Sequence, residues 1–299
     1  MTTIRVAVPR KGRPLEAVLE RLAARTDEAA VADDVISTLR YEKAVTKGRQ
    51  SATADVYDRL AEYSDLSSPT EPEYSLVRDD RDGMPRRIVF DSVTIPVGDL
   101  DVQLVGREEP FRALRKHEFA LGFDSADLVL EEVVELRADP LAELAAVNER
   151  IDPQDTDVRL VSGLGDTVWH TLLATPEVRG SLESDLDRTF VAAYEGTLCI
   201  SPRYERLVEA VVGTDALDGV EFTYPENGDT EEAAIADAGL GVYLTVTGST
   251  ARDHGLVLGG RLFPSETVLL ENVSEVTPAA REAADLFENE RTKTELLAE

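Results

Sequence analysis

The segment Leu244-Thr-Val-Thr-Gly-Ser-Thr-Ala-Arg-Asp-His-Gly-Leu256 joins a strand, a glycine turn and the start of a helix. The β-branched run before Gly248 predicts the strand, and the chain after the glycine continues as a helix. Backbone N–H groups at a helix start lack partners within the helix, and the helix dipole favours an anion there by about 0.3–1 kcal/mol. With the hydroxyls of Thr247, Ser249 and Thr250, the turn is a candidate phosphate site. An ordinary turn with a Ser or Thr helix cap fits the same residues.

A second junction of the same kind lies near the N-terminus, in Ile4-Arg-Val-Ala-Val-Pro-Arg-Lys-Gly-Arg-Pro-Leu15. An alternating apolar strand runs into a basic glycine turn, and Pro14 suits the first turn of the helix that follows. Lys11 and Arg13 therefore flank Gly12 at another helix start. In a chain so poor in lysine this placement favours an anion, and solvated charges at a strand end are the alternative.

Strand-like and helix-like stretches alternate along the chain. Strands are expected at residues 4–8, 87–90, 102–105, 119–123, 158–161, 189–193, 242–246 and 268–270. Helices are expected between them, at residues 15–25, 53–63, 109–116, 141–148, 166–173, 203–212 and 278–288. This alternation predicts an α/β fold with mainly parallel sheets. The turn-rich, charged residues 64–86 are expected to form an inserted loop or hairpin.

Composition limits the classes of partner and the compartment. The chain has 299 residues, a formal net charge of −28 and 42% hydrophobic residues, so it is long enough for an ample core. Acid excess with scarce lysine is typical of a halophilic cytoplasmic protein, since the Debye length is about 3 Å in molar salt. The absence of a basic stripe argues against nucleic acid. No apolar run suggests a signal peptide or a membrane span.

Several polar or reactive residues do not combine into a recognisable centre. The spacing of the three histidines predicts no zinc site. Cys199, the only cysteine, is expected to be a small core residue. Trp169 and His170, after a glycine-rich turn, either pack in the core or line a ligand cleft.

Three segments together carry a resemblance to a known family. They are Ala7-Val-Pro-Arg-Lys-Gly-Arg13, Phe119-Ala-Leu-Gly-Phe-Asp-Ser-Ala-Asp-Leu-Val-Leu-Glu-Glu132, and the Thr-Gly-Ser-Thr turn at 247–250 with Gly255-Leu256. In order and rough spacing they resemble ATP phosphoribosyltransferase, the first enzyme of histidine biosynthesis. The chain departs from the family pattern at Tyr243, where an acidic residue is usual.

The resemblance implies two α/β lobes similar to type II periplasmic binding proteins, with the ligand cleft between the lobes. Lobe I would comprise residues 1–136 and 257–299, with an insertion at about 26–96. Lobe II would comprise residues 137–256 and carry the phosphate-binding loop. Independently of the family, ligands of open parallel sheets bind at the carboxyl ends of strands, where both glycine turns fall. We expect no separate regulatory domain after Leu270, and the oligomeric state, a homo-oligomer included, stays open.

The implied reaction is transfer of phosphoribose from phosphoribosyl pyrophosphate to N1 of ATP, with pyrophosphate leaving together with Mg²⁺. Gly248, Ser249 and Thr250 would bind the 5-phosphate of the ribose. Lys11 and Arg13 would face the triphosphate or the pyrophosphate. The resemblance identifies no catalytic residue here, and Mg²⁺ would be carried by the substrate phosphates rather than by a protein site.

The remaining candidates belong to the same two turns or lie beside them. Gly12 and Thr247 complete the substrate-binding turns. Asp124 and Tyr243 are candidates for contacts to the ribose or to Mg²⁺-bound water, although a phenol cannot replace a carboxylate as an acceptor at neutral pH. Asp124, like Asp127, could instead cap a helix. The alternative function is a non-catalytic paralogue that binds a sugar phosphate or nucleotide in a regulatory or accessory role.

Overall fold

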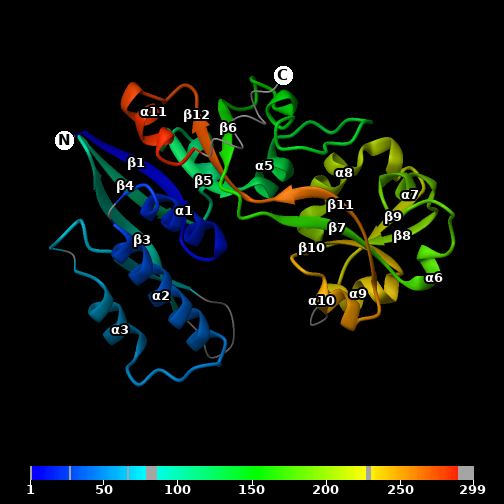
Figure 1. Cartoon of the computed structure of the whole chain (residues 1–299), viewed down its shortest axis with the longest axis horizontal. Helices are drawn as coiled ribbons and strands as arrows, with labels where there is room; N and C mark the ends of the chain where they lie inside the picture. The colour runs from blue at the N-terminus through cyan, green and yellow to red at the C-terminus, as the bar shows by residue number, and fades with distance from the viewer. Residues whose placement is uncertain (1, 27, 66, 79–85, 227–229, 289–299) are drawn as a thin grey trace. The chain divides into compact units, whose positions relative to one another are not determined.

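The computed structural model describes residues 2–26, 28–65, 67–78, 86–226 and 230–288, and the chain divides into two compact units (Figure 1). Unit 1 comprises Met1–Asp124, Asp157–Asp166 and Thr267–Glu299, and unit 2 comprises Ser125–Thr156 and Thr167–Glu266. The chain thus passes between the units four times. The bounds expected from the sequence were 1–136 with 257–299 for one lobe and 137–256 for the other, and they miss the return of residues 157–166 to unit 1.

Unit 1 is built on a seven-stranded mixed sheet with the order β2-β3-β4-β1-β5-β12-β6. Its centre is parallel: β1 (Thr2–Pro9) pairs with β4 (Leu100–Arg107) on one side and β5 (Leu121–Ser125) on the other. Its margins are antiparallel. On one margin β2 (Glu73–Arg78) pairs with β3 (Arg86–Val97), and on the other β12 (Thr267–Asn272) pairs with β6 (Val158–Gly163). β3 also runs antiparallel to β4.

Helices cover the unit 1 sheet and bury one apolar core. The helices are α1 (Arg13–Ala23), α2 (Ala29–Thr46), α3 (Val56–Tyr63), α4 (Pro110–Arg115) and α11 (Pro278–Asp285). Figure 1 shows α1 and α2 running along the strands β1, β3 and β4. Helical spacing explains the packing, because Leu15, Val18, Leu19 and Leu22 of α1 fall on one face and are buried in the core cluster.

Unit 2 has a five-stranded mixed sheet with the order β11-β7-β10-β8-β9. The strands are β7 (Val168–Ala174), β8 (Gly196–Cys199), β9 (Val220–Thr223), β10 (Leu240–Thr245) and β11 (Val257–Ser265). β7 is antiparallel to both of its neighbours, whereas β8 is parallel to β9 and β10. The helices are α5 (Ala126–Glu132), α6 (Pro176–Arg179), α7 (Arg188–Ala193), α8 (Glu205–Val212), α9 (Glu231–Ala238) and α10 (Ser249–Asp253), with single 3₁₀ turns at Asn148–Arg150, Pro202–Tyr204 and Thr214–Leu217.

The α/β class is confirmed, as is the burial of Cys199. Within the segment 64–86, expected as an inserted loop or hairpin, Glu73–Arg78 form β2, which pairs antiparallel with β3. Residues 79–85 lie outside the described residues. Both sheets are mixed rather than mainly parallel, because hairpins and returning strands supply their margins. No helix among the described residues has the length and hydropathy needed to cross a bilayer.

Three predicted elements are wrong, and in each case a specific contact decides the structure. The helix expected at 166–173 is the strand β7, which pairs on both edges. The strand expected at 189–193 is the helix α7, because the Asp187 side chain accepts from the backbone of Thr189 and Phe190 and caps it. The segment 141–148 is irregular up to a 3₁₀ turn, and the N–H of Leu141 donates to the carbonyl of Ala210 instead of continuing a helix.

Candidate functional site

The turn at residues 10–13 follows β1 and begins α1, as the sequence predicts. Gly12 is the N-cap residue at φ 83°, a conformation that favours glycine, and the cap has no side-chain hydrogen bond. Its carbonyl accepts from the N–H of Glu16 and starts the helical ladder. The first N–H groups of α1 therefore face away from the helix without a side-chain cap, as an anion site requires.

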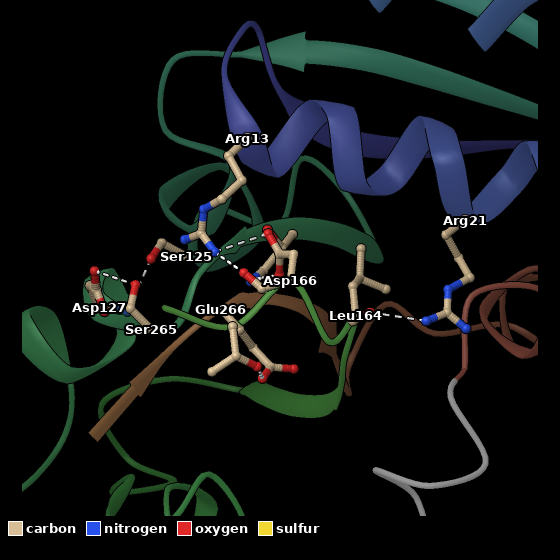
Figure 2. A network of polar contacts seen from close by, with 10 residues as sticks. Arg13, Arg21, Ser125, Asp127, Leu164, Asp166, Ser265 and Glu266 are labelled. Carbon is tan, nitrogen blue, oxygen red and sulfur yellow. Dashed lines mark hydrogen bonds and ion pairs between the residues drawn. The ribbon is translucent and has the colours of Figure 1, made fainter. Parts of the chain in front are cut away.

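Ion pairs hold the basic residues of this turn. The Arg10 guanidinium lies 3.3 Å from Asp91 Oδ1, and Lys11 Nζ lies 4.0 Å from Glu108 Oε2. Arg13 lies 3.2 Å from Asp166 Oδ2 and donates to the Asp166 carbonyl, as Figure 2 shows. All three cations are partly or largely exposed, so water and salt screen these pairs. Arg13 thus joins the start of α1 to Asp166, at the end of the segment 157–166, in addition to any role in binding.

A cavity of about 350 Å³ opens beside this turn within unit 1. Its lining includes Lys11 and Gly12 of the turn, Lys43 of α2 with Lys47 directly after it, and Arg87 of β3. Sequence reasoning missed this arrangement because the helix α2 was not predicted. The available signal was the apolar spacing of Ala32, Val35, Ile36 and Leu39, which are all buried.

The turn at residues 247–250 has the expected strand–turn–helix geometry. Gly248 is left-handed at φ 69° and precedes the short helix α10. The hydroxyls are partly engaged with the turn itself: Thr247 Oγ1 lies 3.2 Å from Ser249 Oγ and accepts from the Ser249 N–H at 3.4 Å. Arg252 donates to the carbonyl of Thr247. Thr247, Ser249 and Thr250 are exposed, which leaves them accessible to a ligand.

Tyr243 lies on β10, in register with Thr171 of β7, and it shares a hydrogen bond with the Glu231 side chain. Burial raises the pKa of the Tyr243 phenol, and the charges of Glu231 and Glu232 raise it further. The phenol therefore stays protonated at neutral pH and acts as a donor. Both glutamates belong to the first turn of α9, so an acidic group lies near Tyr243 even though the residue itself is not acidic.

Asp124 is buried, and its side chain does not cap the helix that follows it. Its Oδ2 accepts from the backbone N–H of Phe111 at 3.0 Å, in the first turn of α4. The helix after it, α5, is capped by Ser125, whose side chain accepts from the N–H of Asp127. Asp124 thus supports the preceding helix, and its candidate role toward ribose stays a prediction.

Unit 2 contains a buried polar network that sequence reasoning did not assemble. Asp127 Oδ1 lies 3.0 Å from His170 Nε2, and Asp127 Oδ2 accepts from the Ser265 hydroxyl at 3.0 Å. Figure 2 shows the contact between Asp127 and Ser265. Burial alone would raise the pKa of Asp127, but the hydrogen bonds and the charge of His170 lower it below its ordinary value. His170, which is 1% exposed, is therefore a core residue, and its ring meets Tyr204 edge-on.

Within the described ranges, no three His, Cys, Asp or Glu side chains are grouped so as to hold a metal ion.

A family model described as halobacterial ATP phosphoribosyltransferase matches residues 1–298 of the chain. The chain belongs to this family. For this family member, the two turns lie in segments that carried the resemblance in the sequence, and Tyr243 is the position at which the chain departs from the family pattern. A search of curated proteins finds no match to it.

The solved structures that match this halobacterial ATP phosphoribosyltransferase family member share little sequence with it. The complex of HisG and HisZ, an ATP phosphoribosyl transferase from Thermotoga maritima, is 14% identical with a TM-score of 0.41, over 98% of this chain and 97% of that one. YhfZ from Shigella flexneri is 11% identical with a TM-score of 0.45, over 100% and 88%. The periplasmic VFT2 domain of BvgS from Bordetella pertussis is 11% identical with a TM-score of 0.39, over 99% and 91%. The family assignment rests on the family model.

Proposed function

We propose that this chain transfers the phosphoribosyl group from phosphoribosyl pyrophosphate to N1 of ATP, the first step of histidine biosynthesis. The family match over residues 1–298 carries this proposal. In the reaction, the N1 lone pair forms a bond to C1 of the ribose while the bond from C1 to the pyrophosphate oxygen breaks. Pyrophosphate leaves with the electron pair of that bond, and Mg²⁺ arrives and leaves with the substrate phosphates.

Chemistry of this class needs charge neutralisation and orientation more than covalent help from the protein. In the proposal, Gly248, Ser249 and Thr250 bind the 5-phosphate of the ribose through backbone N–H groups and hydroxyls. Lys11 and Arg13 supply positive charge for the triphosphate or the leaving pyrophosphate. The support for these roles is the exposed hydroxyls of the first group and the uncapped helix start beside the second.

The surroundings of Tyr243 bear on the position where the family usually has an acidic residue. Glu231 and Glu232 bring carboxylates close to the phenol. We propose that Glu231 supplies the acceptor for a ribose hydroxyl or for Mg²⁺-bound water, with Tyr243 holding it in place. Glu231→Gln should then lower transfer, whereas Asp237→Asn, an exposed carboxylate on the same helix, should not.

The departure at Tyr243 also favours a second candidate, a non-catalytic member that binds a sugar phosphate or nucleotide in a regulatory or accessory role. The two functions differ in product. A transferase releases pyrophosphate only when both substrates are present. A binding protein gains stability from one ligand and releases none, and a ligand at about 100 times its dissociation constant adds roughly 2.7 kcal/mol to the free energy of unfolding.

Pyrophosphate release by the purified full chain is the deciding experiment. The assay contains Mg²⁺, ATP and phosphoribosyl pyrophosphate in molar KCl, because the net charge of −28 requires screening. Each component is omitted in turn. Release that needs both substrates supports the transferase. Absence of release, combined with thermal stabilisation by one substrate, would replace it with the binding protein.

A further inference from the structure

The cavity beside the first turn concentrates positive charge in a strongly acidic protein. Lys11, Lys43 and Lys47 are three of the five lysines in the chain, and Arg87 adds a fourth cation. Glu16 is the acidic residue of the lining, and Arg40 already pairs with it at 2.6 Å. The cavity therefore carries a net positive charge, in a chain whose field otherwise repels anions.

Three of these cations lack an acidic partner in the described part of the chain. Lys43, Lys47 and Arg87 form no ion pair with a described residue. Arg87 Nε is buried, and it has no hydrogen-bond partner among the described residues. A buried donor without a partner costs free energy, so its presence points to a group that binds there.

The spacing on α2 presents both lysines to the same side. Lys43 and Lys47 are four residues apart, and Leu39 continues the same stripe, so all three line the cavity. Two like charges at this spacing weaken a helix. Lys43 in the last turn of α2 and Lys47 at its C-cap interact favourably with the helix dipole, which partly offsets their mutual repulsion. The dipole does not explain Arg87, which lies on the strand β3.

The shape and walls of the cavity suit a phosphate chain. Its volume of about 350 Å³ falls in the range of ligand pockets, roughly 300–1,000 Å³. Leu39 and Ile88 provide apolar wall, which strengthens the field of the surrounding cations. A triphosphate gathers several negative charges in one chain and offers more acceptor oxygens than a carboxylate, and Lys and Arg are its usual protein partners.

We propose that Lys43, Lys47 and Arg87 form, together with Lys11, a site for a linear polyphosphate chain such as the triphosphate of a nucleotide. The helix α2, which lies in the segment expected as an insertion, would thus extend the basic glycine turn into a polyphosphate pocket. The choice of occupant rests on the proposed function, since ATP is the triphosphate that a transferase would use. A free inorganic polyphosphate has the same chemistry and would bind the same cations.

The test titrates inorganic tripolyphosphate into the purified full chain and measures binding by calorimetry. Lys43→Gln combined with Lys47→Gln should weaken binding by about tenfold or more, because each charged hydrogen bond contributes strongly. Lys116→Gln combined with Arg281→Gln makes the same change in net charge at exposed positions away from the cavity and should leave affinity unchanged. Lys43→Arg with Lys47→Arg should restore binding. Equal affinities of the two Gln double variants, or no binding by the native chain, would overturn the proposal.

The kinetics of the same variants identify the occupant. A raised KM for ATP in the pocket variant, with kcat retained, supports the nucleotide triphosphate as occupant. An unchanged KM with weaker tripolyphosphate binding supports a free polyphosphate in the same pocket. The proposed function and this site can fail separately. If the chain releases no pyrophosphate, calorimetry with tripolyphosphate still tests the site. If the chain is an active transferase but the Lys43/Lys47 double variant binds tripolyphosphate as tightly as its control, the site alone is contradicted.

Discussion

The two glycine turns begin their helices alike, but they offer an anion different groups. The turn of unit 1 follows β1 and leads into α1, which has 11 residues, beside a cavity lined by cations. The turn of unit 2 follows β10 and leads into α10, which has 5 residues, and presents exposed hydroxyls. The first can neutralise charge, whereas the second can surround one phosphate with hydrogen-bond donors.

Their supports differ as well. Exposed ion pairs hold the basic turn, so its side chains can exchange partners with a ligand at small cost. The hydroxyl turn depends on β11, where Leu258 lies against Gly248 and Ser265 donates to the buried Asp127. Unit 1 thus places positive charge on side chains that can move, whereas unit 2 fixes the shape of a backbone turn.

The largest effect should come from breaking the buried pair of Asp127 and His170, whose carboxylate also accepts from Ser265 of β11. Asp127→Asn should lower the free energy of unfolding by about 3 kcal/mol or more, because it leaves His170 without its charged partner. The Asp127 pKa is lowered in the fold, so this stabilisation is complete above the unfolded pKa of about 3.9 and is lost as pH falls through the folded pKa.

Denaturant unfolding across a pH series measures this difference. The gap in the free energy of unfolding between the native chain and Asp127→Asn should narrow as the pH falls below about 4. Asp237→Asn removes an exposed carboxylate and serves as the control. A gap that does not depend on pH would contradict the role of the Asp127 charge.

The next effect should come from changing the backbone shape of the hydroxyl turn. A Cβ atom at Gly248 would lie 2.1 Å from Leu258 Cδ2, at a φ of +69° that L residues rarely adopt. Gly248→Val should cost about 2–4 kcal/mol of stability from strain and overpacking, and transfer should fall at least about a hundredfold. Thermal unfolding and pyrophosphate release measure the two losses.

Gly255 offers a matched position, since its φ is +75° but nothing lies within 4 Å of an added Cβ. Gly255→Val should therefore show the strain alone, about 1–2 kcal/mol. If both variants lose the same stability and activity, the contact with Leu258 has no special role in shaping the turn.

Removing one cation from the basic turn should change binding and leave the fold almost unaltered. Lys11→Ala should raise the KM for a phosphate substrate by about tenfold, because one charged contact is lost. The half-exposed contact with Glu108 at 4.0 Å contributes little to stability, so the thermal midpoint should stay within error of the native one. Steady-state kinetics measure the KM of Lys11→Ala, with Lys116→Ala as the control variant. An equal rise in KM for the control would indicate a general charge effect.

The smallest effect should come from Arg13, whose pair with Asp166 is partly exposed. Arg13→Gln should cost at most about 1 kcal/mol of stability. Arg21→Gln on the same helix loses one hydrogen bond to the Leu164 carbonyl and should cost less. A larger loss for Arg21→Gln in denaturant unfolding would show that the contact of Arg21 with Leu164, rather than that of Arg13 with Asp166, is the stronger tie between α1 and residues 157–166.

Local patterns predicted part of the fold and part of the site. β1 with α1 and β10 with α10 follow from apolar alternation and from the glycine turns, because these signals act over a few neighbouring residues. The prediction of a helix at 166–173 was wrong for the opposite reason, because the strand β7 pairs with β10 and β11, which are far away along the chain. The secondary-structure propensities of neighbouring residues do not predict such long-range pairing.

The sequence by itself determined the α/β class, the two glycine turns and the placement of Lys11 and Arg13 at a helix start. Only the tertiary structure decided that Lys43, Lys47 and Arg87 share a cavity with Lys11, and that Asp127 meets His170. Turns and helix starts depend on local backbone geometry, which neighbouring residues specify. Cavities and buried pairs depend on which distant segments pack together, and burial in the core selects that arrangement.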